Sequence, residues 1–312
     1  MTNVDNKLDR AWAARDIDAE AMRQLTKEMP PSELWSLLLG VIEQRAATRA
    51  IAAVADQWTE DRFVQPAAVD PRVSMSIDQV LFAVAESFEA IELSPLAPLG
   101  TSSVVAPTSQ NRVVSTVRGT EVVSDPTNVL ALECARRLRE DSTQMVKFAC
   151  SHRCMRAQPF PKLPGFAAHF RMFCLATAGH ETKDQTFTAE ALTDHIRTHL
   201  RGIAAFQQNG FALSAPSVTL LSTDARRPLS DRIARALPDL NVKQEVLTKP
   251  YYNGLRFMIN VAGSSGEIPL VDGGAFDWVA KLASNRKLVF VASGIGSQLV
   301  AHLFRRDAAE SR

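Results

Sequence analysis

The chain has 312 residues, 46% of them hydrophobic and 22% charged, which is typical of a globular protein with one large or two modest domains. A formal net charge of +1 excludes the strong overall positive field of many nucleic-acid-binding proteins. The first ten residues lack an apolar signal-peptide core, and apolar runs such as 35–42 are too short to cross a bilayer. We therefore expect a cytoplasmic protein that does not contact the membrane.

Residues 1–65 are predicted to form an N-terminal helical segment. Positions 11–25 are rich in strong helix formers. Pro30-Pro31 then interrupts the pattern, and 32–56 resumes it with apolar residues near the helical period. A packing or dimerisation appendage is the simplest interpretation of this segment. A loop containing Pro66 and Pro71 separates it from the rest of the chain.

Residues 76–312 are predicted to form the main domain. Ser76 can cap a helix at 77–90, and a short strand at 91–95 ends at Pro95. The remaining predicted elements are a hairpin at 113–123, a helix at 128–139, strands at 145–150 and 170–177, a helix at 188–208, a strand at 218–222, a helix at 226–237, and strands at 252–261, 267–271 and 288–292. Hairpins and covering helices without regular βαβ alternation indicate an α+β fold with a mostly antiparallel sheet.

The four cysteines are Cys134, Cys150, Cys154 and Cys174. Cys150 and Cys154 flank His152 in a tract that looks like part of a metal site. No second ligand pair follows at zinc spacing. We predict no metal site and reduced, structural thiols.

Three motifs near the end of the chain carry a family resemblance. They are Tyr-Tyr-Asn-Gly at 251–254 before an apolar run, Val-Asp-Gly-Gly-Ala-Phe-Asp at 271–277, and Phe-Val-Ala-Ser-Gly-Ile-Gly-Ser-Gln-Leu at 290–299. Their order and spacing resemble the class II aminoacyl-tRNA synthetase core of histidyl type, over about residues 76–304. The regulatory subunit of ATP phosphoribosyltransferase, which is not a synthetase, has a similar pattern. The resemblance implies an antiparallel sheet flanked by helices and a homodimer built on the element at 77–95.

The segment Asp125-Pro126-Thr127 resembles the family element in which an acid binds the α-ammonium of the amino acid and a threonine assists. A carboxylate in a concave site is a suitable partner for an ammonium group. The same residues can instead form a turn and a helix N-cap. Both interpretations stay open at this point.

The family's second motif is similar to the residues around Arg156, the position whose arginine holds the α-phosphate of ATP and the substrate carboxylate. Arg156 is therefore the candidate catalytic residue. The motif's glutamate is replaced by Gln158. Arg153 is interpreted as an ordinary solvated arginine. On the following strand, the two positions that read the amino-acid side chain fall on Leu175 and Gly179, which removes polar contacts.

Tyr251 and Tyr252 occupy the place where the family's tyrosine pair lines the imidazole pocket. They could instead simply alternate between the core and the surface of a strand. The arginine expected upstream falls on Leu247, and Lys249 could supply a cation instead. In the third motif, Gln298 stands at the place of the arginine that stacks on adenine. Because Gln158 and Gln298 replace two ionised groups that bind the triphosphate and its metal ion, we predict weak or absent ATP binding.

Only 14 residues follow Gln298, so no anticodon-binding domain is expected within this chain and tRNA charging is unfavoured. The first hypothesis is a paralog that binds an amino acid or amine and acts as a regulatory or accessory subunit. The second is an adenylate-forming amino-acid ligase using ATP and magnesium, with a carrier, an amine or another acceptor. A purely structural dimer is the third. The sequence does not identify the amino acid, because two presumed side-chain readers are altered.

Overall fold

A computed structural model describes residues 18–160, 166–263 and 266–305. The chain divides into two compact units, one formed by Met1–Thr59 with Thr116–Thr120 and the other by Glu60–Ser115 with Glu121–Arg312. The predicted helix at 11–25 lies partly outside the described residues. The predicted boundary near residue 65 falls close to the start of the second unit.

The described part of the first unit is mainly helical. Its elements are α2 (Ala19–Arg23), η1 (Gln24–Glu28), α3 (Pro31–Ala47) and the greater part of α4 (Ile51–Glu60). The single helix predicted at 32–56 is two helices, and the first begins at Pro31, whose missing N–H has no partner to lose in a first helical turn. No residue of α2, α3 or α4 is buried, and Ile51 and Trp58 are among the exposed apolar side chains.

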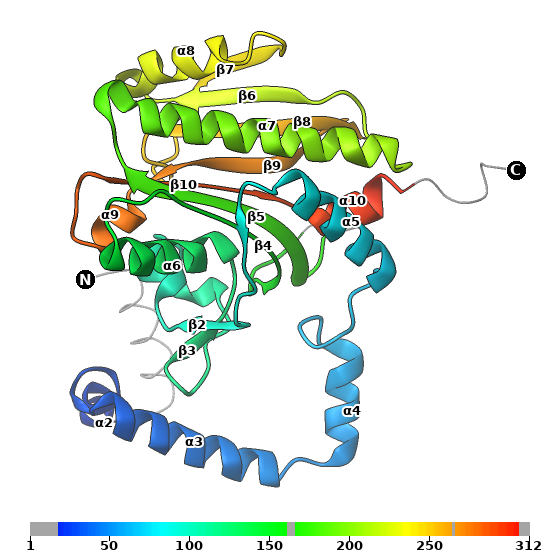
Figure 1. Cartoon of the computed structure of the whole chain (residues 1–312). Helices are drawn as coiled ribbons and strands as arrows, with labels where there is room; N and C mark the ends of the chain where they lie inside the picture. Colours follow the sequence, from blue (N-terminus) through cyan, green and yellow to red (C-terminus); the bar gives the residue numbers. More distant parts are fainter. Residues whose placement is uncertain (1–17, 161–165, 264–265, 306–312) are drawn as a thin grey trace, which may run out of the picture. The chain divides into compact units, whose positions relative to one another are not determined.

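The second unit is built on an eight-stranded sheet in the order β1-β4-β5-β10-β9-β8-β6-β7 (Figure 1). Two pairs, β1 with β4 and β6 with β7, are parallel, and the other five are antiparallel. The α+β prediction is therefore confirmed. The strand bounds are β1 (Glu89–Ala90), β4 (Val146–Met155), β5 (His169–His180), β6 (Ser217–Ser222), β7 (Val242–Val246), β8 (Leu255–Gly263), β9 (Gly266–Phe276) and β10 (Leu288–Ile295).

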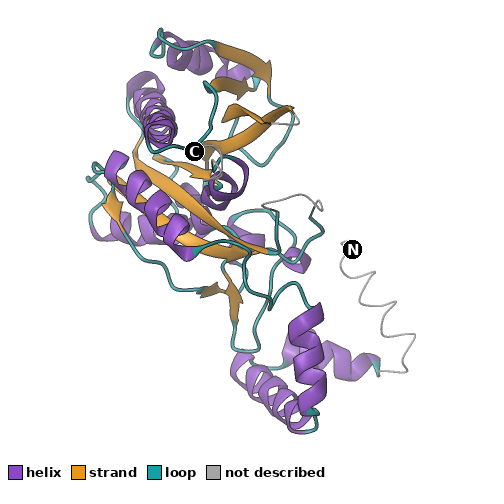
Figure 2. Ribbon diagram, turned by 90° about the vertical axis from the view of Figure 1, so that its right-hand side faces the viewer, coloured by secondary structure: helices purple, strands orange, loops and turns teal. Residues whose placement is uncertain are grey.

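Helices cover both faces of this sheet (Figure 2). On one face, the core includes side chains of α5 (Pro71–Val84), α7 (Thr186–Gln208), α8 (Arg227–Arg235) and α10 (Ser297–Leu303). On the other, α6 (Pro126–Glu140) and α9 (Trp278–Leu282) pack against the strands. The two cores take alternate residues of each central strand, as in β5, where Leu175 belongs to the first and Cys174 and Ala176 to the second. This alternation decides which side chains reach the site.

Several predicted boundaries are wrong at the start of this unit. Helix α5 begins at Pro71, not after Ser76, because Asp70 caps it by accepting a hydrogen bond from Arg72 N at 2.9 Å. No strand forms at 91–95, because the two-residue β1 ends at Ala90 and only Ile91 N still donates to the sheet, to the carbonyl of Ala149 at 2.9 Å. A small second sheet pairs β2 (Leu96–Pro98) with β3 (Thr120–Val122). Short helical turns complete the unit: η2 (Thr101–Val105), η3 (Gln110–Arg112), η4 (Lys183–Gln185) and η5 (Asp224–Arg226).

All four cysteines are buried and free, and burial raises the pKa of Cys154 to about 12. A thiol of such high pKa is poorly nucleophilic at neutral pH. Among the described residues, no group of three or more His, Cys, Asp or Glu side chains is placed to hold a metal ion. None of the helices in this part of the chain has the length and apolar character needed to cross a membrane.

Candidate functional site

A cavity of about 520 Å³ lies beside the N-terminal end of α6. It lies on the face of the sheet that α6 covers, and Met172, Phe276 and Ala292 form part of its apolar lining. The sequence-predicted residues that line it are Asp125, Thr127, Arg156, Gln158, Lys249, Tyr251 and Tyr252. Residues far apart in the chain are therefore brought together around one cavity.

Asp125 is both a helix cap and a cavity residue. Its Oδ1 accepts hydrogen bonds from the backbone N of Thr127 at 3.0 Å and from Thr127 Oγ1 at 2.8 Å, which caps α6. Its Oδ2 faces Arg156 Nη2 at 3.3 Å, and 23% of the Asp125 side chain stays exposed. A carboxylate offers about four acceptor positions. One position is therefore left for a ligand, and the two interpretations of Asp125 are compatible.

Arg156 is held in place by four contacts, one of them from Nη2 to Met172 Sδ at 3.8 Å. Its Nε donates to the carbonyl of Ser124 at 2.9 Å, and its Nη2 meets Asp125. The guanidinium carbon lies 5.0 Å from the centre of the Phe170 ring, within the range of a cation–π contact. Its Nη1 makes no hydrogen bond within the part of the chain that the structure describes. That edge of the fork is placed to bind an anionic oxygen of a ligand.

Aromatic rings form one wall of the cavity. Tyr251 makes edge contacts with Tyr252, Phe276 and Trp278 at centroid distances of 5.1, 5.6 and 5.7 Å, and Phe276 stacks on Trp278 at 4.0 Å. Burial raises the pKa of both tyrosines, so both hydroxyls are protonated at neutral pH. The wall thus offers flat apolar surface and neutral hydroxyl groups.

A tight turn after the tyrosines depends on Gly254. Its φ is +77°, and an added Cβ would lie 2.7 Å from Arg226 Cγ. A side chain would be both strained and crowded there. Gly254 N donates to the carbonyl of Tyr252 at 2.8 Å, which closes the turn from the tyrosine pair into β8.

Sequence reasoning missed an ion pair beside the tyrosines. Arg256 donates from Nε and Nη2 to the two carboxylate oxygens of Asp272, at 2.9 and 2.8 Å, and this contact raises the pKa of Arg256. The hydroxyl of Tyr252 donates to Asp272 Oδ1 at 2.8 Å. The pairing joins neighbouring strands, since Arg256 lies opposite Gly274, two residues along β9 from Asp272. Asp272 belongs to the motif at 271–277, but no sequence pattern around Arg256 indicates that it pairs with Asp272.

Asn128 is a second residue that the sequence did not identify. It lies in the first turn of α6, lines the cavity and is only 2% exposed. Its side-chain Oδ1 is buried and has no hydrogen-bond partner among the described residues. An unpaired buried polar atom costs about 1–3 kcal/mol. A ligand donor or a water in the cavity would remove this cost.

Cations outnumber acids around the cavity. Arg156 and Arg256 are each paired with an aspartate. Arg112 and Lys249 also line the cavity and form no ion pair within the described ranges. The cavity can therefore accept net negative charge as well as an ammonium group beside Asp125.

Three predicted site residues lie elsewhere, and their roles are corrected. Leu175 belongs to the core of the opposite sheet face. Gly179 lies four residues further along β5 and therefore on the same face of the sheet. A Cβ at Gly179 would meet Phe187, which packs against that same core. Gln298 is 4% exposed in α10 and accepts a hydrogen bond from Arg153 Nη1 at 3.2 Å. None of these three lines the cavity.

The fold is similar to that of class II aminoacyl-tRNA synthetases and of an ATP phosphoribosyltransferase regulatory subunit. A structure described as an ATP phosphoribosyltransferase regulatory subunit/histidyl-tRNA synthetase from Bacillus halodurans C matches with a TM-score of 0.55 and 14% identity, over 78% of this chain and 82% of that one. A histidine–tRNA ligase subunit from Alicyclobacillus acidocaldarius matches with a TM-score of 0.58 and 14% identity, over 77% and 95%.

The fold is shared with a synthetase of another specificity. A threonyl-tRNA synthetase from Aeropyrum pernix, described as putative, matches with a TM-score of 0.57 and 12% identity, over 73% of this chain and 58% of that one. No protein-family profile and no curated protein sequence matches the chain. At these identities the similarity establishes the architecture, and the ligand must be argued from the cavity.

Proposed function

We propose that the protein binds an amino acid or amine in this cavity and acts as a regulatory or accessory subunit that does not charge tRNA. The observation that carries the proposal is the partly exposed carboxylate of Asp125, held by Thr127 and Arg156 at the cavity wall. Its remaining acceptor position suits an ammonium group.

The surrounding groups support one orientation of the ligand. Its ammonium group would face Asp125 and the unpaired Oδ1 of Asn128. A ligand carboxylate would meet Arg156 Nη1 or Arg112, and an apolar side chain would pack against Tyr251. The apolar lining by Met172, Phe276 and Ala292 favours a ligand less polar than histidine. Leu175 and Gly179 do not contribute to this preference, because they do not line the cavity.

The comparison with a structure described as a regulatory subunit supports a role with a protein partner. We further propose that the protein works in the cytoplasm as a homodimer. In this proposal the ligand is sensed in the cavity and the partner protein responds. No cofactor is required for binding alone.

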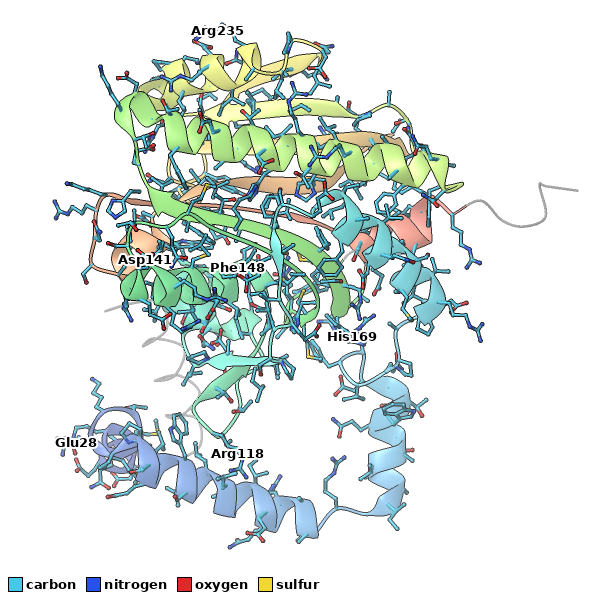
Figure 3. The ribbon with its side chains drawn as sticks, viewed as in Figure 1. Glu28, Arg118, Asp141, Phe148, His169 and Arg235 are labelled. Carbon is cyan, nitrogen blue, oxygen red and sulfur yellow. The ribbon has the colours of Figure 1, made fainter. Side chains whose placement is uncertain are left out.

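The first test exploits two aspartates with the same local geometry. Asp141 accepts from Thr143 N at 2.9 Å and from Thr143 Oγ1 at 2.7 Å, as Asp125 does from Thr127, but Asp141 lies at the other end of α6 and outside the cavity (Figure 3). In a thermal-shift screen of amino acids and amines, Asp125→Asn should weaken binding of the best ligand about tenfold or more. Asp141→Asn should leave binding unchanged. Equal stabilisation of both variants would make Asp125 only a helix cap.

The second prediction concerns assembly. The segment from α5 to Pro95 should pack across a two-fold axis and give an isologous dimer. Multi-angle light scattering at micromolar concentration should report twice the 34.2 kDa mass of the chain. A monomer at every concentration would argue against the dimer.

The excess of cations around the cavity favours one rival function. Arg112 and Lys249, which have no acidic partner in the described structure, could bind phosphate groups of ATP with magnesium, as an adenylate-forming ligase requires. Gln158 lines the cavity without the negative charge that the family uses there. We therefore expect no ATP–pyrophosphate exchange with any amino acid and only weak binding of magnesium-ATP by calorimetry. Amino-acid-dependent exchange that Arg156→Ala abolishes would establish the ligase instead.

A further inference from the structure

A second cavity, of about 590 Å³, lies between the start of α5 and the strands β4 and β5. It shares no lining residue with the first cavity. Its charged and polar lining consists of Ser74, Asp78, Arg153, His169 and Arg171. Figure 3 shows His169 near the beginning of β5.

Two arginines face each other across the strand pair beside this cavity. Arg153 and Arg171 are directly opposed in the register of β4 and β5, so their side chains leave the same face of the sheet. Both are partly buried. Like charges directly opposite one another destabilise a strand pair. A compensating negative charge is therefore needed.

The described residues supply only one such charge at short range. Asp78 Oδ2 lies 2.9 Å from Arg171 Nη1, and Asp78 Oδ1 accepts from Ser151 Oγ at 2.6 Å. Burial raises the pKa of Asp78, against the lowering effects of its contacts with Ser151 and Arg171. Arg171 also keeps a buried Nε without a hydrogen-bond partner in the described structure.

Arg153 forms no ion pair with any described acid. Its Nη1 contacts His169 Nδ1 at 3.2 Å and Gln298 Oε1 at 3.2 Å. His169 Nε2 is 2.7 Å from the carbonyl of Gln65, so it donates there while Nδ1 accepts from Arg153. Burial and the charge of Arg171 lower the pKa of Arg153. The expectation that Arg153 is an ordinary solvated strand arginine is corrected.

We infer that this second cavity binds a small oxyanion, a phosphate or carboxylate group, between Arg153 and Arg171. Guanidinium groups match the oxygens of such anions in paired hydrogen bonds. The anion would separate the two like charges and give the buried N–H of Arg171 an acceptor. The Ser74 side chain lines the same space.

The test is an anion titration with variants at both cavities. Wild-type protein is titrated with inorganic phosphate, malonate and acetate at constant ionic strength set with chloride, and thermal unfolding and calorimetry are recorded. We expect phosphate or malonate to stabilise the protein more than acetate does. Arg153→Gln should weaken the binding at least tenfold, and Arg235→Gln, at an exposed arginine of α8 that lines neither cavity, should not.

A second readout keeps the test valid if phosphate binding is weak. Without added anion, Arg153→Gln should melt at the same or a higher temperature than wild type, because it removes the opposed positive charge. Arg153→Lys, which keeps the charge but not the fork, should retain only part of the anion effect. Loss of the effect in Arg112→Gln, in the first cavity, but not in Arg153→Gln would overturn the inference, and so would the absence of any anion effect at tens of millimolar. The relative strength of phosphate and malonate identifies the class of oxyanion.

Discussion

Lowering the pH from 7 to 5 is expected to reduce the unfolding free energy of the second unit by about 4 kcal/mol, because two buried histidines resist protonation. His195 and His199 lie on α7 and are at most 1% exposed. Both contact Ser293 Oγ, from His195 Nδ1 at 2.9 Å and from His199 Nε2 at 2.8 Å. His195 Nε2 is also 2.9 Å from Thr177 Oγ1. No acid is hydrogen-bonded to either ring in the described structure.

Burial lowers the pKa of His195 far below its usual value, helped by His199 and Lys147, and lowers that of His199 to about 3. Both rings are thus neutral in the folded protein at pH 5, whereas the unfolded chain protonates them below a pKa of about 6.5. Their contribution is present above pH 6.5 and is lost as the pH falls towards 3. Each ring accounts for about 2 kcal/mol between pH 7 and pH 5.

Urea unfolding at pH 7, 6 and 5 measures this loss. His199→Gln should reduce the dependence of the unfolding free energy on pH by about half, whatever its effect on stability at pH 7. His180→Gln, at the end of β5 and outside the network, should not change that dependence. Equal unfolding free energies of wild type at pH 7 and pH 5 would show that the rings are accessible to protons.

Substituting Gly274 is expected to cost about 3 kcal/mol and to weaken ligand binding at the same time. An added Cβ would lie 2.4 Å from the carbonyl oxygen of Leu255 and 2.6 Å from Tyr252 Cδ1. The first neighbour is backbone in the paired strand β8 and cannot rotate away. Tyr252 must move as well, and it forms part of the aromatic wall and holds Asp272.

Gly202→Ala is the matched control for Gly274→Ala. Its Cβ would lie 3.1 Å from Leu81 Cδ2, the end of a flexible side chain, and alanine is favoured inside a helix such as α7. Its unfolding free energy should stay within about 1 kcal/mol of wild type. Denaturant unfolding and ligand titration of both variants check the prediction. Equal stability of the two variants would contradict the close packing of β8 against β9.

Segments with a clear apolar pattern were predictable from the sequence. A mostly exposed strand and a helix start with two possible caps were not. The apolar runs of β4, β5 and β10 carry their own signal. The edge strand β7 was missed because its Val-Lys-Gln-Glu-Val sequence is mostly exposed and has no buried face to reveal. The start of α5 was misplaced because Ser76 is a plausible cap, although Asp70-Pro71 provides a cap and a first residue together.

The sequence identifies site residues that are adjacent in the chain. It does not identify side chains that pair across neighbouring strands. Asp125 and Thr127 are neighbours in sequence, and the tyrosine pair is contiguous. Leu175 was misassigned because a shift of one residue along a strand reverses the face on which a side chain lies. The pairing of Arg256 with Asp272 depends on the register of β8 with β9, which no local pattern specifies.

The most direct test of the central claim compares a ligand with its own analogue lacking the amine. The best amino acid from the screen and its des-amino carboxylic acid are titrated by calorimetry into wild-type protein and Asp125→Asn. The account predicts that removing the amine weakens binding to wild type about tenfold or more, and that the same removal has little further effect on Asp125→Asn. Equal losses in the two proteins would show that the ammonium group does not contact Asp125, and would contradict the proposed site.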